Sequence, residues 1–281
     1  MSSSLKQRLI TAAVGLPLVF SSIFLFPQKN HLFFCIVVIF VSTCGSWELK
    51  NNLIEKKIST PPTSYLGILL PVIELVNINF FPTVEITRFA LAAFVGISFL
   101  WEIFSGAKDN FEHSLVRIAC TILNIVYPGL FMVYGIRLCY LPDAEVMIAT
   151  FIAVVLGSDS FAYIFGMLFG KNNKGIVKCS PNKSIAGFLG GTVFIGLAGA
   201  VISLIWPELY PFSPLTVFLL FLCTSIFGTA GDLFESMLKR SCGVKDAGVM
   251  IPGRGGMLDC IDSISVAVPI FVIGVELILV W

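Results

Sequence analysis

The sequence predicts an all-α, polytopic integral membrane protein with about nine transmembrane helices. Of its 281 residues, 57% are hydrophobic and 12% are charged, whereas about a quarter of the residues in soluble domains are charged. The chain also contains apolar segments that approach the roughly 20 residues an α-helix needs to cross a bilayer. They lie at residues 9–26, 32–47, 65–81, 89–104, 118–140, 146–169, 186–206, 214–231 and 263–280.

The first segment has two readings, a signal peptide or a retained helix, because Lys6 and Arg8 precede its apolar run. We favour the retained helix, since the run is long and FPQK follows it in place of a small-residue cleavage site. The distribution of Lys and Arg predicts a cytoplasmic amino terminus, because positive charge near helix ends stays inside. Fifteen of the 18 basic residues then face inward, all but Lys29, Arg88 and Arg137. We therefore expect a multi-pass protein of the inner (cytoplasmic) membrane.

The two halves of the chain differ in where their polar residues lie. Residues 1–150 carry their charges in short loops and are expected to form a scaffold of transmembrane helices. In residues 151–281 polar residues and glycines enter the helices themselves, which predicts a catalytic region with a polar cavity facing the cytoplasm. A net charge of +1 argues against a nucleic-acid partner. The eight cysteines include no C-x-x-C pair and are expected to be packing residues.

Four acidic residues of the first half need separate interpretations. Glu48, Glu102 and Glu112 lie at predicted membrane edges near Lys or Arg, so we expect solvated interfacial ion pairs. Glu74 lies inside an apolar segment, where a carboxylate is costly. This cost suggests a functional role for Glu74, but its position near the outer end of its predicted helix makes it a weaker candidate than the acids of the second half.

The segment FGTAGDLFESMLKR predicts a helix with a polar stripe. Its polar residues follow the i, i+3, i+4, i+7 spacing that places side chains on one helical face. They are Asp232, Glu235, Ser236 and Lys239. Downstream, GGMLDCIDS spaces Asp259 and Asp262 three residues apart, so both point the same way if a helix begins there. Asp232 and Asp259 would then be natural joint ligands of Mg²⁺, which takes one or two carboxylates and completes its shell with phosphate oxygens and water.

The residues between these acids fit a polyphosphate. The basic ones can neutralise phosphate charge, and the glycines let backbone amides approach phosphate oxygens. The basic residues are Lys239, Arg240, Lys245 and Arg254, and the glycines are Gly253, Gly255 and Gly256. The alternative is an ordinary cytoplasmic loop in which acids balance topology-setting bases.

A second polar constellation precedes this one. Asp159 lies inside an apolar segment, where it must face a polar cavity or a partner. The following loop, KCSPNKSIAGFLGG, contains Ser180 and Lys183, which could hold an anionic headgroup. Ser180-Pro181 could equally be a helix-start signal, with Lys183 a topology charge.

These residues resemble the signature of the phosphatidate cytidylyltransferases, also called CDP-diacylglycerol synthases. That signature reads S-x-hydrophobic-K-R, four residues, K-D-x-G, three residues, P-G-H-G-G-hydrophobic-x-D-R-hydrophobic-D. The matching residues are Ser236, Lys239, Arg240, Lys245, Asp246, Gly248, Pro252, Gly253, Gly255, Gly256, Asp259 and Asp262. Upstream family elements match at Asp159, Ala162, Tyr163, Gly166, Gly170, Ser180, Pro181, Lys183, Ser184, Gly187, Phe188, Gly190 and Gly191.

Three positions depart from the family pattern. Arg254 replaces the usual histidine, Cys260 replaces the usual arginine, and Ala186 stands where many members have glutamate. Both carboxylates of the D-x-x-D pair remain. Arg254 keeps positive charge near the phosphates, although it cannot act as an acid or base at neutral pH.

The resemblance implies an Mg²⁺-dependent enzyme that joins CTP to phosphatidate of the inner leaflet and releases pyrophosphate. It also implies a second cation and a homodimer. In this reading Asp246 and Asp262 are further ligands or organisers of basic side chains, and Lys239 acts with the catalytic acids. The triphosphate, nucleotide or lipid phosphate would contact Asp159, Ser180, Lys183, Ser236, Arg240, Lys245, Arg254, Gly255 and Gly256. The alternatives are a CTP-dependent polyprenol or lipid kinase and an ion-coupled transporter using Asp159 and Asp232. A further alternative is an inactive homologue, because Arg254 and Cys260 depart from the signature.

Overall fold

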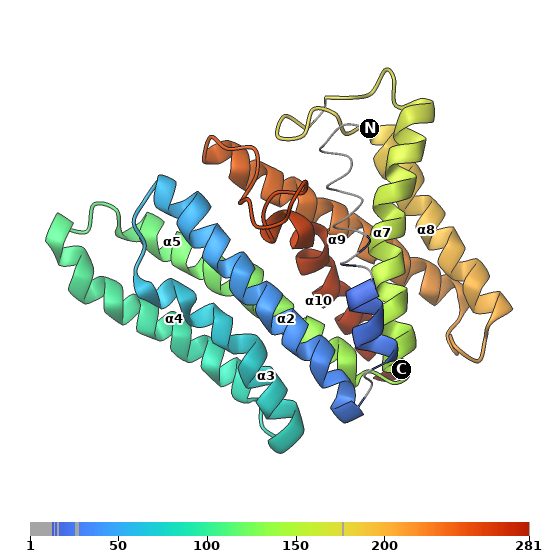
Figure 1. Ribbon diagram of the computed structural model, residues 1–281, viewed down its shortest axis with the longest axis horizontal. Helices are drawn as coiled ribbons and strands as arrows, with labels where there is room; N and C mark the ends of the chain where they lie inside the picture. Colours follow the sequence, from blue (N-terminus) through green and yellow to red (C-terminus); the bar gives the residue numbers. More distant parts are fainter. Residues whose placement is uncertain (1–12, 14, 16, 26–27, 176, 281) are drawn as a thin grey trace. The chain divides into compact units, whose positions relative to one another are not determined.

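The protein is all-helical over the part of the chain that the computed structural model describes, residues 13, 15, 17–25, 28–175 and 177–280 (Figure 1). Only two isolated β-bridges occur among these residues. The helices are α2 (Gln28–Glu48), α3 (Leu69–Phe80), α4 (Ile86–Ser105), α5 (Ser114–Ile125), α6 (Phe131–Arg137), α7 (Ala144–Phe169), α8 (Ile185–Ile205), α9 (Pro214–Ser241) and α10 (Leu258–Val280). The all-α prediction is confirmed.

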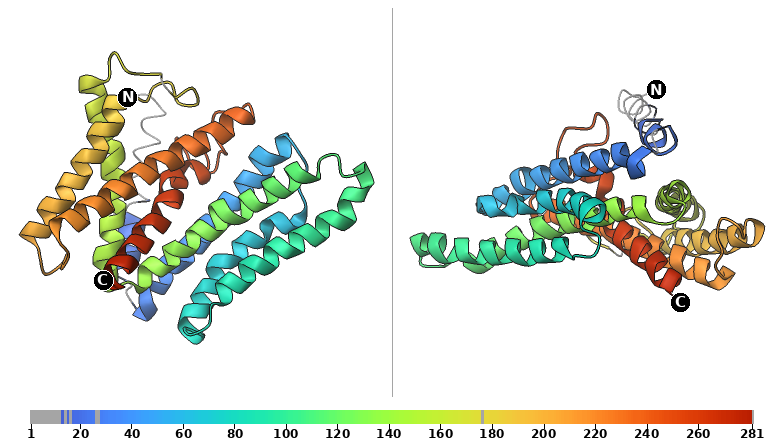
Figure 2. Two further views of the ribbon diagram at one scale, coloured as in Figure 1. Left: turned by 180° about the vertical axis from the view of Figure 1, so that it is seen from behind. Right: turned by 90° about the horizontal axis from the view of Figure 1, so that it is seen from below.

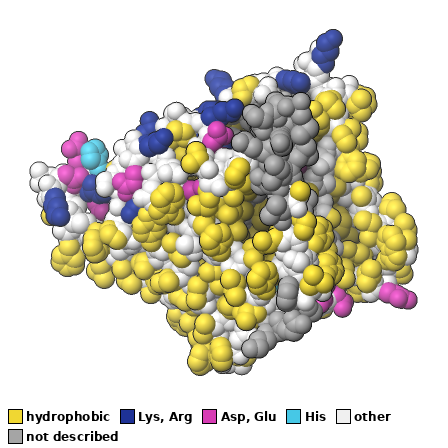
Figure 3. Space-filling view, in the orientation of Figure 1, with side chains coloured by type: hydrophobic (Ala, Val, Ile, Leu, Met, Phe, Trp, Pro, Cys, Tyr) yellow, Lys and Arg dark blue, Asp and Glu magenta, His cyan; other side chains and the backbone are white. Residues whose placement is uncertain are grey.

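Within the described residues, 8 helical spans are long and apolar enough to cross a membrane. They correspond in order to the second through ninth segments predicted from the sequence. They are Asn30–Lys56, Pro62–Phe80, Ile86–Asp109, Ser114–Tyr140, Ala144–Phe169, Ile185–Ile205, Pro214–Ser241 and Leu258–Val280. The first predicted segment, residues 9–26, lies partly outside the described residues, and the cytoplasmic position of the amino terminus stays a prediction. Hydrophobic side chains cover most of the face drawn in Figure 3, as a bilayer solvent requires.

The chain forms two compact units, each built from two separate stretches of sequence. The first unit contains Met1–Cys139 and Ser241–Ile261, and the second contains Tyr140–Arg240 and Asp262–Trp281. The segment that carries most of the signature therefore belongs with the amino-terminal helices. The division of roles at residue 150 stays a prediction.

In the first unit, α2, α3, α4 and α5 lie side by side (Figures 1 and 2). Leu70, Ile125 and Val133 form a buried core cluster, against which Phe94 of α4 packs. Buried apolar surface of this kind supplies most of the stability of packed helices in water, whereas tight packing supplies it in lipid.

Two acidic side chains of the first unit are buried, so the prediction that they are solvated was wrong. Glu48 and Glu102 are only 1% and 3% exposed. Glu102 Oε1 accepts hydrogen bonds from Arg117 Nη2 and Ser114 Oγ, both at 2.6 Å. The short connection between α4 and α5 brings Glu102 next to Arg117 and Ser114. The order of charges along the sequence does not show that this contact is buried. Glu112 is exposed, as predicted.

Glu74 is paired within the first unit. Its carboxylate is 1% exposed, and its Oε1 accepts a hydrogen bond from Arg137 Nε at 2.6 Å. The pair joins α3 to α6. This contact explains how a carboxylate is tolerated inside an apolar segment.

In the second unit, α7 and α8 lie side by side along much of their length (Figure 2). Glycines of α8 make this approach possible. A Cβ at Gly191 would lie 2.6 Å from the backbone nitrogen of Ala162, and one at Gly187 would lie 2.5 Å from the Ala162 carbonyl oxygen. A buried hydroxyl contact between Ser158 and Ser225, at 2.5 Å, joins α7 to α9.

Candidate active site

Charged side chains from three helices and one loop meet in the second unit. Asp159 of α7 lies within electrostatic range of Lys183 and Asp232. Asp262 of α10 lies within range of Asp159, Asp232 and Lys239. Five of the predicted site residues are therefore brought together, although they span more than a hundred positions of sequence.

The loop at residues 171–184 is held against α9. Lys183 Nζ forms an ion pair with Asp232 Oδ2, and Cys179 Sγ donates to the carbonyl oxygen of Leu233 at 3.6 Å. A β-bridge between Lys174 and Ser184 closes the base of the loop. Lys183 is thus a partner of a site carboxylate rather than only a topology charge.

Helix α8 begins at Ile185, with Ser184 as its N-cap. The Ser184 hydroxyl accepts a hydrogen bond from the Gly187 N–H at 3.1 Å, which satisfies one of the free donors of the first turn. The alternative reading of Ser180-Pro181 as the helix start is therefore wrong. Ser180 instead lies in a turn, where its carbonyl oxygen accepts from the Lys183 N–H at 3.2 Å.

The predicted polar stripe on α9 consists of two i, i+4 pairs. Ser236 Oγ donates to Asp232 Oδ1 at 3.5 Å, and Lys239 forms an ion pair with Glu235. Glu235 is fully buried and Lys239 nearly so. A buried ion pair is tolerated only when each charge has its partner. Lys239 therefore neutralises the buried Glu235, in addition to its predicted catalytic role.

A close contact between α9 and α10 places two of the acids near each other. A Cβ at Gly231 would lie 2.4 Å from the backbone carbonyl oxygen of Asp262. Only glycine allows the two backbones to approach this far. Because Asp232 follows Gly231 directly, the contact brings the backbones that carry Asp232 and Asp262 close together.

The donor chemistry of this cluster fits a hard divalent cation. Asp159, Asp232 and Asp262 supply carboxylate oxygens, the ligands that Mg²⁺ prefers. Over the described part of the chain, no group of three or more His, Cys, Asp or Glu is arranged as a metal site. Lys183 takes up one oxygen of Asp232 in this arrangement.

The signature loop, which we define as residues 242–257 between α9 and α10, contains a tight turn in the first unit. The Ile251 N–H donates to the Gly255 carbonyl oxygen at 2.7 Å, and the Gly255 N–H donates back at 3.0 Å. Gly253 and Gly255 have φ angles of 77° and 109°, a region that side chains other than glycine rarely adopt. Arg254 lies exposed between them.

Asp259, in the first turn of α10, organises this loop. Its Oδ2 accepts hydrogen bonds from the Ala247 N–H at 2.8 Å and from the Gly256 N–H at 2.7 Å. The Gly255 amide thus bonds within the loop, and the Gly256 amide bonds to the first turn of α10. Lys245 and Asp246 are exposed.

The predicted site residues divide between the two units. Those of the second unit are Asp159, Ser180, Lys183, Asp232, Ser236, Lys239, Arg240 and Asp262, and those of the first are Lys245, Asp246, Arg254, Gly255, Gly256 and Asp259. A single Mg²⁺ shared by Asp232 and Asp259 therefore stays a prediction.

Sequence reasoning missed Glu48. Its Oε2 accepts a hydrogen bond from the backbone N–H of Leu258 at 2.8 Å, across 210 positions of sequence. The nearby Lys50 suggested that Glu48 forms a local ion pair with it. No spacing rule relates Glu48 to the signature loop. The one available signal was the burial cost of a carboxylate directly after an apolar run.

Comparison with known proteins covers nearly the whole chain. The model of the cytidylyltransferase family matches residues 6–278. The chain belongs to this family. A cytidylyltransferase family member from Staphylococcus haemolyticus, named phosphatidate cytidylyltransferase, is 30% identical over 95% of this chain and 97% of its own length.

Other relatives have similar coverage. The phosphatidate cytidylyltransferase of Bacillus subtilis is 31% identical over 94% of this chain and 95% of its own. A protein of Escherichia coli described as uncharacterized protein YnbB is 28% identical over 92% of this chain and 83% of its own. The two relatives named phosphatidate cytidylyltransferase therefore cover both units of this cytidylyltransferase family member.

Proposed function

We propose that this protein is a phosphatidate cytidylyltransferase, which converts CTP and phosphatidate to CDP-diacylglycerol and pyrophosphate. The observation that carries the proposal is the match, over almost the full length of both chains, to proteins named for this reaction. The charged cluster of the second unit supports the proposal. Its carboxylates are suited to a divalent cation, and its lysines are suited to the phosphates of a nucleoside triphosphate.

The reaction needs little acid–base chemistry from the protein. A phosphatidate oxygen attacks the α-phosphorus of CTP, the new P–O bond forms, and the bond from the α-phosphorus to the bridging oxygen breaks. Pyrophosphate leaves with that oxygen and its electron pair. Because the attacking phosphate is already ionised, no side chain must remove a proton, and catalysis depends on positioning and charge stabilisation.

The side chains of the second unit are suited to these two tasks. Lys183 and Ser180 would hold a phosphate of the nucleotide or the lipid, and Lys239 would stabilise charge that develops on the leaving pyrophosphate. Arg240 would add positive charge at the end of α9, while Lys245 and Arg254 would bind the triphosphate from the signature loop. In this structure Lys183 and Lys239 are each paired with an acid, so substrate competes with an existing partner.

We further propose that the enzyme depends on Mg²⁺. When bound, Mg²⁺ would offset the charge of the triphosphate and of the leaving group. Asp232 and Asp259 are the expected joint ligands, with Asp246 and Asp262 as further ligands or organisers of the basic side chains. A second cation, a homodimer and a location in the inner membrane complete the proposal.

A labelled-substrate experiment tests the reaction. Purified protein is incubated with phosphatidate, Mg²⁺ and CTP labelled at either the α- or the γ-phosphate. Label from the α-phosphate should enter the lipid, and pyrophosphate should appear in equal amount. Omission of Mg²⁺, with EDTA present, should abolish both.

The alternatives give different results in the same assay. A CTP-dependent lipid kinase would place the γ-label in the lipid, and a transporter would release no pyrophosphate at all. Either result with well-folded protein would overturn the proposal.

A further inference from the structure

We propose that Glu48, at the end of α2, is a positioning residue that holds the signature loop and the start of α10 in place. The effect of Glu48 on catalysis rests on the proposed function, whereas its role in holding the loop does not. Every residue in the argument belongs to the first unit. The amino-terminal helices would then be part of the site's construction rather than a separate scaffold.

The carboxylate of Glu48 is enclosed by the signature loop. Oε2 accepts from the Leu258 N–H at 2.8 Å. A Cβ at Gly248 would lie 2.5 Å from Oε1, and a Cβ at Gly256 would lie 2.4 Å from Oε2. Two glycines therefore leave the space that this one carboxylate fills, and the fit explains their presence without reference to a substrate.

The position of Glu48 is also electrostatically favourable. Leu258 is the first residue of α10, and the first N–H groups of a helix have no partner within the helix. A negative charge at this end interacts favourably with the helix dipole. Glu48 thus caps α10 from a different helix. The N–H that it binds belongs to Leu258, the residue directly before Asp259.

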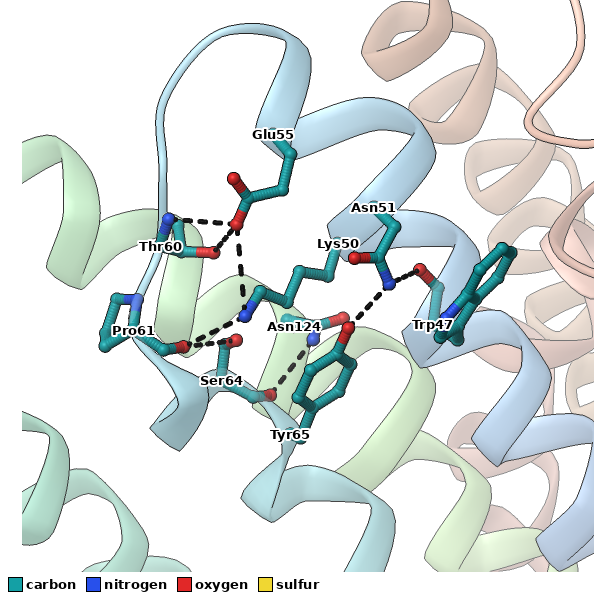
Figure 4. A network of polar contacts seen from close by, with 9 residues as sticks. All are labelled: Trp47, Lys50, Asn51, Glu55, Thr60, Pro61, Ser64, Tyr65 and Asn124. Carbon is teal, nitrogen blue, oxygen red and sulfur yellow. Dashed lines mark hydrogen bonds and ion pairs between the residues drawn. The ribbon is translucent and has the colours of Figure 1, made fainter.

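The backbone after Glu48 is held by a partly buried polar network (Figure 4). A π-helical turn, Leu49–Leu53, follows Glu48 directly, and such turns are rare and occur mostly as single turns inside α-helices, often at functional sites. Lys50 within it is 7% exposed. Its Nζ lies 3.4 Å from the Pro61 carbonyl oxygen, 3.9 Å from Glu55 Oε1 and 4.4 Å from the centre of the Tyr65 ring.

This network separates the charge of Lys50 from that of Glu48. Lys50 uses Glu55 as its acidic partner, so the Glu48 carboxylate is left to the loop. Glu48 and Asp259 then act on the two sides of Gly256, one by filling the space beside its Cα and one by accepting its N–H. Together they fix the loop that presents Lys245 and Arg254.

The first experiment measures loop order without any activity assay. Purified Glu48→Ala and Glu48→Gln proteins are treated with trypsin, and cleavage after Lys245 and Arg254 is followed by fragment mass. We expect cleavage about tenfold faster in Glu48→Ala, the size of losing one hydrogen bond to a charged group. Glu48→Gln should be intermediate, because its amide oxygen still accepts from Leu258.

Glu102→Gln provides the matched control. Glu102 is an equally buried acid of the first unit, but its partners are Arg117 and Ser114. Its substitution should lower thermal stability without changing cleavage of the loop in folded protein. If the Glu48 variants cleave no faster than this control, the positioning role is overturned.

A double-mutant cycle tests the contact between Glu48 and Gly256 directly, and Gly256→Ala alone tests it if Glu48→Ala does not fold. Gly256→Ala should destabilise the loop, because its methyl group would meet the Glu48 carboxylate. In the Glu48→Ala background that collision is removed, so the second substitution should cost several-fold less. Gly96→Ala is the control, because an added Cβ there would meet no atom within 4 Å beyond its own stretch of helix. Additive effects of the two substitutions would contradict the proposal.

Kinetics then link loop order to catalysis. We expect Glu48→Gln to raise the KM for CTP or lower kcat about tenfold, in proportion to loop cleavage. Unchanged kinetics with a disordered loop would show that Glu48 does not serve the reaction. If wild-type protein fails to label lipid while the cleavage results hold, the reaction assignment fails and the positioning role stands.

Discussion

The ammonium group of Lys183 pairs with the carboxylate of Asp232, so the loop before α8 is anchored to α9 by one of the acids proposed to hold Mg²⁺. The same acid accepts a hydrogen bond from Ser236. Three predicted site residues are therefore already in contact before a substrate is considered. This arrangement makes the charge balance of the cluster testable by single substitutions.

Lys183→Met should raise the KM for CTP or phosphatidate about tenfold, because it removes one cation from the cluster and leaves Asp232 without its partner. The initial rate of pyrophosphate release at varied substrate is the measurement. Lys178→Met is the control, since Lys178 is an exposed residue of the same loop. Equal effects of the two substitutions would contradict a specific role for Lys183.

Gly231→Ala should destabilise the protein by about 1–3 kcal/mol, because its methyl group would collide with the Asp262 carbonyl oxygen. Gly228→Ala on the same helix has its nearest neighbour at 3.7 Å and should be neutral or stabilising. Thermal unfolding in detergent distinguishes the two. Similar melting temperatures would mean that α9 and α10 do not approach at Gly231.

Arg137→Met should destabilise the protein by about 3–5 kcal/mol, because it leaves the buried Glu74 without its partner. Arg88→Met removes an exposed pair with Glu85 and should change stability by less than about 1 kcal/mol. Unfolding midpoints of both variants check the contrast. If Arg137→Met melts like wild type but loses activity, Glu74 has a functional rather than a structural role.

Asp259→Asn should lower turnover on the order of 100-fold or more while the protein stays folded, since its amide oxygen can still accept from Ala247 and Gly256. Asp259→Ala should also speed tryptic cleavage of the signature loop. Comparison of the two variants distinguishes the contribution of the Asp259 charge from that of its hydrogen bonds. Near-normal turnover in Asp259→Asn would rule out its role as a metal ligand.

Arg254→His should be tolerated, with turnover within about twofold of wild type, because Arg254 is exposed at the tip of its turn. Turnover at pH 7 with saturating CTP is the measurement. A loss of tenfold or more would show that the arginine makes a contact that histidine cannot replace.

Much of the fold followed from hydrophobic length alone. Eight of the predicted spans correspond to helices, because a bilayer permits few alternatives to an α-helix for a long apolar segment. The face shared by Asp232 and Ser236 also followed from helical spacing. These features depend on local periodicity, which a single sequence contains.

The burial of charged groups did not follow from the sequence. Glu48 and Lys50 are neighbours in sequence, yet one contacts Leu258 and the other contacts Glu55. A π-helical turn begins at Leu49, directly after Glu48, and includes Lys50, and no composition or spacing rule predicts such a turn. Contacts over 210 positions depend on tertiary packing, so they were missed.

The division of the first unit has a consequence for biosynthesis. Its last piece, Ser241–Ile261, leaves the ribosome only after the intervening Tyr140–Arg240, a delay of roughly 5–20 s for about a hundred residues at usual translation rates. During that interval Glu48 has been inserted without the amide it will later bind. The amino-terminal helices must therefore wait, partly assembled, for the end of the chain to arrive.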